Sequence, residues 1–183
     1  IAEKIGFPVV MKVFSDDIVH KFDVKGVYLN VNSAKEAREA YQAIHKNVSE
    51  KMPEAKVTGI YVAKMITGGE EVILGVKRDP SFGPVIMFGL GGIFVEIFRD
   101  VNFRVAPVNE QAAEEMILNT RSSGMLTGAR GRTPRDIAMI RTCIQRLSQL
   151  AIDCPQIKEL DINPMIVLDE GKGCFVADAK IML

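Results

Sequence analysis

Near the end of the chain, two oxygen-bearing side chains have a spacing that could hold a divalent cation. Residues 160–181 contain two runs rich in Val, Ile, Leu and Phe around the sequence Asp-Glu-Gly-Lys-Gly, which is typical of a turn. This pattern predicts a β-hairpin in which a tight turn pairs Leu168 with Gly173. In that register Asn163 lies directly opposite Asp178, with Cβ atoms roughly 5 Å apart, so one cation could contact both side chains.

The donor types in this hairpin favour magnesium. Amide and carboxylate oxygens, without His or Cys, suit Mg²⁺, which takes one or two protein ligands and completes its coordination with water and phosphate. Because strand side chains alternate between faces, Asp161 shares the face of Asn163 and adds an acidic neighbour. The alternative is a surface hairpin with solvated polar side chains, and the hairpin residues alone leave both interpretations open.

A lysine in an otherwise apolar strand is a second candidate. Residues 8–14 predict a buried strand in which Lys12 carries the one charge. A buried ammonium group needs a partner, because its desolvation is costly. Phosphate oxygens and a structural carboxylate are equally suitable partners. The polar loop that follows, with His20 and Lys21, could cover phosphates or could be an ordinary surface loop.

Two further charged residues stand among apolar neighbours. Glu96 and Arg104 each need a partner there, and they could pair with each other or with Asp100. The nearby glycines of residues 89–92 do not form a dinucleotide-binding fingerprint, because its third glycine falls on Phe94 and no helix start follows.

Composition limits the classes of function. The 183 residues are 48% hydrophobic, and 23 basic residues balance 23 acidic ones, so a broad nucleic-acid or anionic-membrane surface is not expected. The three cysteines are scattered without metal-ligand spacing, which fits reduced thiols in a cytoplasmic protein. We recognise no signal peptide and no membrane-spanning run. The chain begins in the middle of a pattern, as expected of a piece of a longer protein.

Periodicity predicts alternating helices and strands. Ser33 and Glu36 form a capping box before a helix at 33–48, and Thr133 is expected to cap a long helix at 133–152. Another helix is expected at 109–120. The predicted strands are 8–14, 26–31, 57–65, 71–77, 85–88 and 93–98, followed by the C-terminal hairpin.

Three separated segments resemble one family. They are the hairpin with its Asp-Ile-Asn-Pro and Asp-Ala-Lys, the loop with its Asp-Ile-x-His-Lys, and the segment FGPVIMFGLGGIFVEIFRDVNFRVAP. The chain resembles the ATP-grasp domain of NDP-forming (ADP-forming) acyl-CoA and acetyl-CoA synthetases, which is related to the succinyl-CoA synthetase β chain. The resemblance implies an α+β ATP-grasp fold without its N-terminal part. Its two subdomains, residues 1–60 and 61–183, would have nucleotide between them.

The same resemblance implies roles for individual residues. In the family an Asn and an Asp of the hairpin hold Mg²⁺, a lysine and a glycine-containing loop contact phosphates, and backbone near the hinge contacts adenine. A histidine receives phosphate, and an arginine neutralises the phosphoryl group. By position, Asn163 and Asp178 are the metal ligands with Asp161 and Glu96 nearby; Lys12, Gly26, Ala63, Met65 and Glu71 bind nucleotide; and His20 and Arg104 are catalytic.

The implied activity is that of a ligase. The family interconverts acyl-CoA, phosphate and ADP with free acid, CoA and ATP, and its ATP-grasp domain works with a CoA-binding or ligase partner domain. Neither nucleic acid nor a membrane is an expected partner. The alternative is a regulatory ligand-binding module of a multidomain protein acetyltransferase. Lys25, where the family has Gly, and Ala129, where it has Tyr, favour this alternative, and Phe22 also departs from the pattern.

Overall fold

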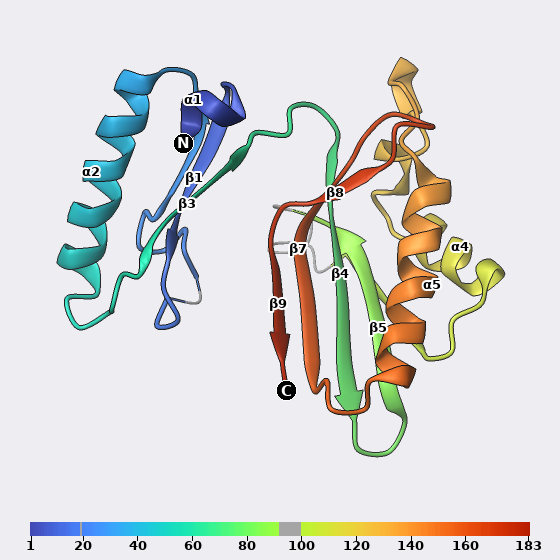
Figure 1. The fold of residues 1–183 in the computed structure, drawn as a ribbon. Coiled ribbons are helices and arrows are strands. Elements are labelled where there is room, and N and C mark those ends of the chain that lie inside the picture. The colour runs from blue at the N-terminus through green and yellow to red at the C-terminus, as the bar shows by residue number, and fades with distance from the viewer. Residues whose placement is uncertain (19, 92–99) are drawn as a thin grey trace. The chain divides into compact units, whose positions relative to one another are not determined.

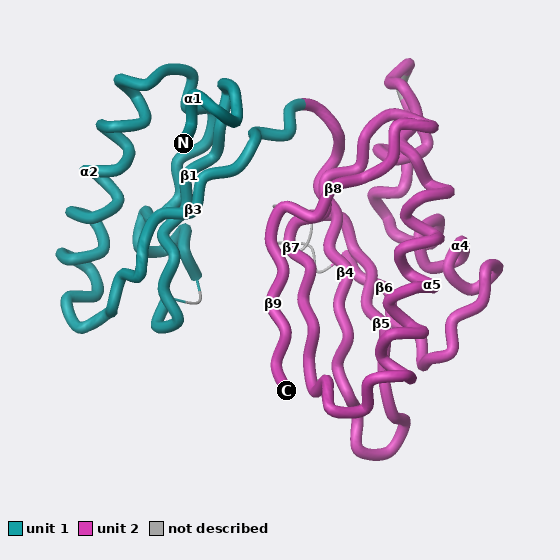
Figure 2. Tube along the Cα trace, in the orientation of Figure 1, with its two compact units in different colours: residues 1–67 teal, residues 68–183 magenta. Residues whose placement is uncertain are grey.

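The computed structural model describes residues 1–18, 20–91 and 100–183, and the chain divides into two compact units. Unit 1 is Ile1–Thr67 and unit 2 is Gly68–Leu183 (Figure 2). The sequence suggested a division near residue 60, within strand β3 (Gly59–Lys64). The structure keeps this strand in unit 1 because it pairs with a strand of that unit along its full length, and the division falls after the strand.

Unit 1 is a three-stranded antiparallel sheet with the strand order β2-β1-β3 and a long helix packed on it (Figure 1). Ser33 caps that helix by accepting the Glu36 amide, and the Glu36 carboxylate accepts the Asn32 amide, so the predicted capping arrangement is present. Its apolar stripe packs against alternate residues of β1. The elements are α1 (Ala2–Ile5), β1 (Val9–Phe14), β2 (Val27–Val31), α2 (Ala34–Lys51) and β3.

Unit 2 is built on a larger antiparallel sheet with the order β6-β5-β4-β7-β8, and β9 also pairs with β7. Its strands are β4 (Glu70–Asp79), β5 (Gly83–Leu90), β6 (Val101–Val105), β7 (Glu159–Val167), β8 (Cys174–Val176) and β9 (Ala179–Met182). Its helices are α4 (Glu110–Leu118), the short 3₁₀ turns η1 (Ser123–Met125) and η2 (Ala129–Gly131), and α5 (Ile137–Asp153).

Helices α4 and α5 cover one face of the unit 2 sheet, which we call the helix face (Figure 1). Leu74, Ile86 and Leu160 point to this face and lie in the main core together with apolar residues of both helices. Alternate residues point the other way, and Gly75 and Asp161, which are paired across β4 and β7, mark what we call the second face. The sheet therefore separates a packed side from a side that presents charged residues.

Within the described ranges, the structure contains no helix that is long and apolar enough to span a membrane.

Candidate functional site

The C-terminal hairpin has the predicted register. The Leu168 amide donates to the Gly173 carbonyl at 3.0 Å, and the Asn163 amide donates to the Asp178 carbonyl at the same distance. The return strand is interrupted, because β8 and β9 flank Ala177 and Asp178, yet both pieces pair with β7 in one register. The prediction that Asn163 lies directly opposite Asp178 is confirmed.

An irregularity in β7 lies at the same place. Between the pairs Leu74–Ile162 and Val72–Met165, strand β7 advances by one residue more than β4, so a β-bulge falls at Asn163 and its successor. A bulge bends its strand and changes the direction of a side chain, and bulges are common next to functional sites. Asn163 is exposed and Asp178 is half-buried, so the side-chain amide of Asn163 and the carboxylate of Asp178 are both within reach of a ligand.

The surroundings of this pair are acidic. Burial raises the pKa of Asp161, and the charges of Glu159 and Asp178 raise it further, while Lys180 opposes the shift from across the ladder. A carboxyl group whose pKa is raised by neighbouring carboxylates lies in a negative potential. That potential would be relieved by a bound cation.

The number of protein ligands at this site is small. Among the residues that the structure describes, no group of three or more His, Cys, Asp and Glu side chains is placed to hold a metal. The Asn163 amide oxygen and the Asp178 carboxylate would supply two ligands. This donor set fits Mg²⁺ that keeps water and phosphate in its other positions, and it does not fit a cage made entirely of protein ligands.

In unit 1, Lys12 lies on the middle strand of the sheet. It pairs with Val27 on one side and Tyr61 on the other, and its side chain is on the face opposite α2. Phe14 and Tyr61 on that face are more than half exposed, so the lysine sits in an exposed aromatic surface. It is half-buried, and it is not enclosed in the apolar core between the sheet and α2.

Gly26 closes the loop that carries His20. The Gly26 amide donates to the Lys21 carbonyl at 2.8 Å, and its carbonyl accepts from the Val13 amide at 2.8 Å. A Cβ at this position would lie 2.6 Å from Val13 Cγ1, so a side chain does not fit. His20 itself is exposed, and its carbonyl accepts from the Asp23 amide at 3.2 Å. The loop is thus held by backbone contacts and presents its imidazole to solvent.

Lys25 adopts a left-handed backbone conformation with φ of 50°. The related pattern has a glycine at this position, and glycine is the residue that adopts positive φ most readily. The structure does have positive φ, and the lysine adopts it, with its carbonyl accepting from the Asn47 side chain at 3.1 Å. The strain falls on Lys25 itself.

The two residues expected near adenine lie at the end of β3. Ala63 pairs with Val10 and shares the face of Lys12. The Met65 amide donates to the Pro8 carbonyl at 3.0 Å and is therefore engaged within unit 1.

Glu71 lies at the start of β4 and is exposed. Because side chains alternate along a strand, Glu71 lies on the second face, as Asp161 does. Glu71 is four positions before Gly75, the residue of β4 that pairs with Asp161. Its carbonyl accepts from the Gly91 amide at 2.6 Å, so β4 and the end of β5 are tightly joined there.

Arg104 lies on the helix face of the sheet. It pairs with the core residue Ile86 across β5 and β6, and its guanidinium is 3.7 Å from the Glu115 carboxylate of α4. A pairing of Arg104 with Glu96 lies outside the described residues, and the Asp100 carboxylate accepts from backbone amides of Arg121 and Ser122. Because β5 and β4 lie between β6 and β7 in the sheet, the structure does not bring Arg104 together with Asn163 and Asp178.

Asp100 anchors the turn after α4. Its two carboxylate oxygens accept from the amides of Arg121 and Ser122, each at 2.9 Å. Burial alone would raise the pKa of Asp100, but the hydrogen bonds from Ser122 and Arg121 hold it below its usual value. Both oxygens of this carboxylate are hydrogen-bonded, so Asp100 has a structural role. From the sequence it was expected only as a possible partner of Arg104.

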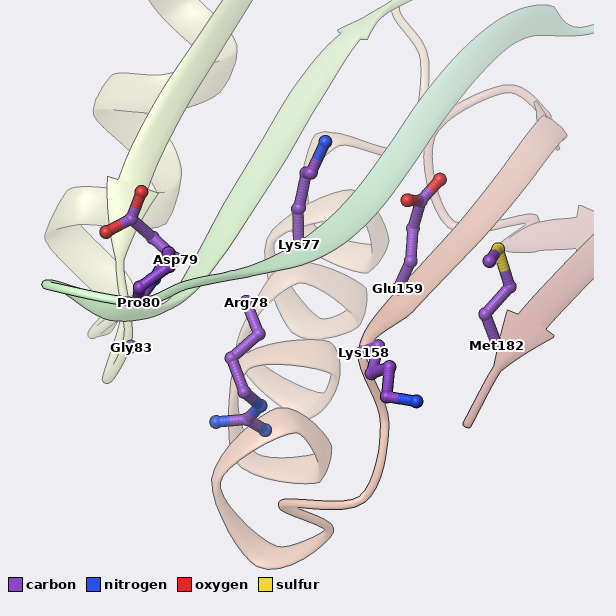
Figure 3. A pocket seen from close by; sticks show the side chains of 8 residues that line it. All are labelled: Lys77, Arg78, Asp79, Pro80, Gly83, Lys158, Glu159 and Met182. Carbon is purple, nitrogen blue, oxygen red and sulfur yellow. The ribbon is translucent and has the colours of Figure 1, made fainter.

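A shallow depression of about 590 Å³ lies at the beginning of β7, and nothing in the sequence indicated it. Figure 3 shows Lys77 and Glu159, which pair across β4 and β7, on one side of the sheet, while Arg78 and Lys158 point to the other side. Arg78 is already used, since it donates to backbone carbonyls of Ile157 and Ala151. The depression contains none of the predicted site residues, but Glu159 connects it to the acidic surroundings of Asp161.

Comparison with known proteins gives a consistent set of relatives. A family model described as an ATP-grasp domain matches residues 1–183. The chain is 46% identical to the ADP-forming 4-hydroxybutyrate–CoA ligase of Nitrosopumilus maritimus, covering all of this chain and 26% of that protein. It is also 46% identical to the β subunit of the ADP-forming acetate–CoA ligase II of Pyrococcus furiosus, covering all of this chain and 78% of that subunit.

Solved structures agree. The dinucleotide-forming acetyl-coenzyme A synthetase 1 of Ca. Korarchaeum cryptofilum, in complex with coenzyme A, Ca-AMPCP and HgCl⁺, superposes with a TM-score of 0.93 at 48% identity, covering 99% of this chain and 78% of that one. A second structure of that enzyme, with coenzyme A and Mg-AMPPCP, has its phosphohistidine segment pointing towards the nucleotide site, and it matches with a TM-score of 0.83 at 44% identity over 99% of this chain and 78% of that one. The chain spans about a quarter of the length of the long relatives and about four-fifths of the β subunits.

Proposed function

The chain belongs to the ATP-grasp domain family, with the fold of ADP-forming acetyl-CoA synthetases, and from this membership we propose that it is the nucleotide-handling domain of an ADP-forming acyl-CoA synthetase. In this proposal it moves a phosphoryl group between ATP or ADP and a phosphohistidine, while a CoA-binding or ligase domain or subunit carries out the chemistry on the acyl group. Relatives that are long single chains, and others that are separate β subunits, support a partner of either kind.

The proposed metal site is the Asn163–Asp178 pair. The observation that carries it is the confirmed ladder register, with Asn163 donating to the Asp178 carbonyl and Asp161 in a negative potential beside it. When bound, Mg²⁺ would neutralise charge on the nucleotide phosphates. The role of the chain's own residues is to fix the position of two oxygen ligands on a rigid ladder, and the role of Asp161 is to keep the local potential negative.

His20 is the proposed phosphoryl acceptor. His20 is exposed, it lies in a loop that backbone hydrogen bonds hold in shape, and Lys21 follows it directly. A neutral imidazole nitrogen is nucleophilic near pH 7, and its phosphoramidate is reactive enough to phosphorylate ADP. Lys12 and Gly26, on the adjoining strand and at the loop's end, are the proposed phosphate contacts, with Ala63 and Met65 near adenine and Glu71 as a further nucleotide contact.

For Arg104 the contacts favour another role. Its ion pair with Glu115 joins β6 to α4 on the helix face, away from the face of Asp161. We propose that Arg104 fastens α4 to the sheet. The phosphoryl role expected from the resemblance would require the guanidinium to leave Glu115 and the helix face.

The regulatory alternative is less well supported. Lys25 was one of its two main supports, and the loop keeps a positive φ at this position despite the side chain. Ala129 remains, at the start of η2, without the aromatic ring of the related pattern. The curated relatives considered above are named as ligases, so we favour the synthetase.

The test of the proposal is a titration of the full-length protein with ADP, with and without Mg²⁺. We expect Asp178→Asn to lower the Mg²⁺-dependent affinity by about tenfold or more, because a charged ligand is lost. Glu170→Gln is the matched control, since it removes one exposed carboxylate from the turn of the same hairpin. If Asp178→Asn keeps the parental Mg²⁺ dependence, the assigned metal site is wrong.

A further inference from the structure

Two of the three cysteines meet in unit 2. Cys143 lies on α5 and Cys174 on β8, and their Sγ atoms are 3.6 Å apart although 31 positions separate the residues in the sequence. Both side chains are half-buried. The third cysteine, Cys154, lies at the other end of α5, where its amide caps the helix. The thiol pair is a product of tertiary structure, and no spacing in the sequence indicates it.

Rigid contacts hold the two thiols in place. Cys174 pairs with the core residue Val167, so its side chain points to the helix face, where α5 packs. Immediately before it, the Gly173 amide donates to the Asp136 carboxylate at 2.9 Å, and the Asp136 amide donates to Leu168 at 3.0 Å. Asp136 is also the N-cap of α5. The turn of the hairpin is therefore fixed to the start of the helix that carries Cys143.

We propose that Cys143 and Cys174 form a reversible disulfide bond that joins α5 to β8. Their sulfur atoms need to approach by about 1.5 Å to reach a bond length near 2.05 Å. Half-buried side chains on adjacent elements can close such a gap by rotation about the Cα–Cβ bond. The proposal concerns contacts within unit 2 alone and does not depend on the synthetase function.

The chemistry is thiol–disulfide exchange with a low-molecular-weight disulfide as the oxidant. Burial and the neighbouring Cys143 raise the pKa of the Cys174 thiol to about 12, so we assign the first attack to Cys143. The Cys143 sulfur attacks the oxidant, breaks its S–S bond and releases one thiol, which leaves a mixed disulfide.

The second exchange completes the bond. Once Cys143 is in the mixed disulfide, its charge no longer opposes ionisation of Cys174. The Cys174 sulfur then attacks the Cys143 sulfur and releases the second small thiol. Two protein thiols lose two electrons and two protons, and one small disulfide is reduced to two thiols, so the exchange is balanced.

The bond would have a measurable physical effect. It would close a long loop of chain, and loop closure of this size lowers the entropy of the unfolded state enough to raise the melting temperature by roughly 10 °C. It would also fix β8, the strand that leads into Asp178, against α5.

The experiment uses the unmodified protein in glutathione buffers from reducing to oxidising. Samples are quenched with acid, alkylated and weighed by intact mass spectrometry, and the peptides are mapped. We expect the oxidised protein to lose two hydrogen atoms and to contain a peptide that links Cys143 with Cys174. Of the three cysteines considered, only Cys154 should be alkylated, and the melting temperature should rise. Dithiothreitol should restore all three thiols and the lower melting temperature.

Two variants sharpen the result. Cys154→Ser should form the bond as the parent does, and Cys143→Ser should not form it or gain thermal stability under oxidation. Alkylation of Cys143, Cys154 and Cys174 throughout the series would overturn the proposal. So would a bond that includes Cys154, or a mixed disulfide on Cys143 that persists without reaction of Cys174.

Discussion

The C-terminal hairpin and the His20 loop differ in what fixes their chemically important side chains. In the hairpin, Asn163 and Asp178 are placed by a backbone hydrogen bond and by the single register that β7 keeps with β8 and β9 on either side of them. In the loop, the chain is placed by single contacts, such as the packing of Gly26 against Val13 and the positive φ of Lys25. A ladder has a fixed period, whereas a loop depends on individual residues, so the two regions should respond differently to substitution.

The difference also matches the chemistry proposed for each region. A metal site needs two ligands at a constant separation, and a ladder between two strands provides it. A residue that relays a phosphoryl group must first meet the group that donates it and then the group that receives it. An exposed loop residue can do this more easily than a residue within a sheet. We therefore expect the hairpin to tolerate substitution of the residues that lie between Asn163 and Asp178. The loop should be sensitive to substitution of the residues that hold it in shape, such as Gly26.

The largest expected effect is on His20. His20→Ala in the full-length protein should lower the rate of acyl-CoA formation by roughly a thousandfold or more, because the covalent intermediate can no longer form. Incubation of the parent with γ-labelled ATP and Mg²⁺ should leave acid-labile, base-stable phosphate on the peptide that contains His20, and the variant should have none there.

His45 is the matched control, because the given sequence has two histidines and this one lies on α2, with its ring tilted against that of Tyr41. His45→Gln should keep both the labelled His20 peptide and the turnover. Parental turnover in His20→Ala would show that phosphate passes directly between the nucleotide and the partner, and would leave the loop without a catalytic role.

The next effect tests whether the loop is as sensitive as its contacts indicate. Gly26→Ala places a Cβ 2.6 Å from Val13 Cγ1, and overpacking of this kind should lower the free energy of unfolding by about 1–3 kcal/mol. Gly59→Ala is the control, because its Cβ would meet nothing within 4 Å. Urea unfolding measures both, and equal stability of the two variants would contradict the idea that the loop depends on single packing contacts.

The sequence predicted the features that depend on the pattern of nearby residues. It did not predict the features that depend on tertiary contacts. The hairpin register and the capping of α2 were predictable because each depends on residues close together in the chain. Thr133 was expected to cap the long helix, but Asp136 does so, because its carboxylate also accepts the Gly173 amide from the hairpin turn. The ion pair of Arg104 with Glu115 and the contact of Cys143 with Cys174 likewise depend on packing of distant segments.

A smaller effect tests the surroundings of Asp161, whose pKa is raised first by burial and then by the charges of Glu159 and Asp178. Because the pKa of Asp161 is raised in the folded protein, its protonated form is favoured by folding, and this stabilisation is lost as the pH rises through the folded pKa. Asp161→Asn should therefore be more stable than the parent at pH 7, by up to about 1 kcal/mol for a partly exposed group. It should be no more stable than the parent below the unfolded pKa.

Thermal unfolding between pH 3 and pH 8 measures this difference, and Glu170→Gln in the same hairpin should show no comparable pH-dependent gain. If Asp161→Asn is less stable than the parent at neutral pH, then the attraction of Lys180 for the ionised Asp161 outweighs burial and the repulsion from the two neighbouring carboxylates. The proposed negative potential would then have the wrong sign.

The smallest expected effect concerns Lys25 and returns to the loop. A side chain at φ of 50° costs about 1–2 kcal/mol relative to glycine, while glycine costs about 0.5–1 kcal/mol in unfolded-state entropy, so Lys25→Gly should stabilise the protein by roughly 0.5 kcal/mol. Asn30 has a similar φ of 53°, but asparagine tolerates this conformation, so Asn30→Gly should change stability less. Paired urea titrations resolve the comparison. A destabilised Lys25→Gly would show that the lysine side chain makes a contact worth more than its backbone strain.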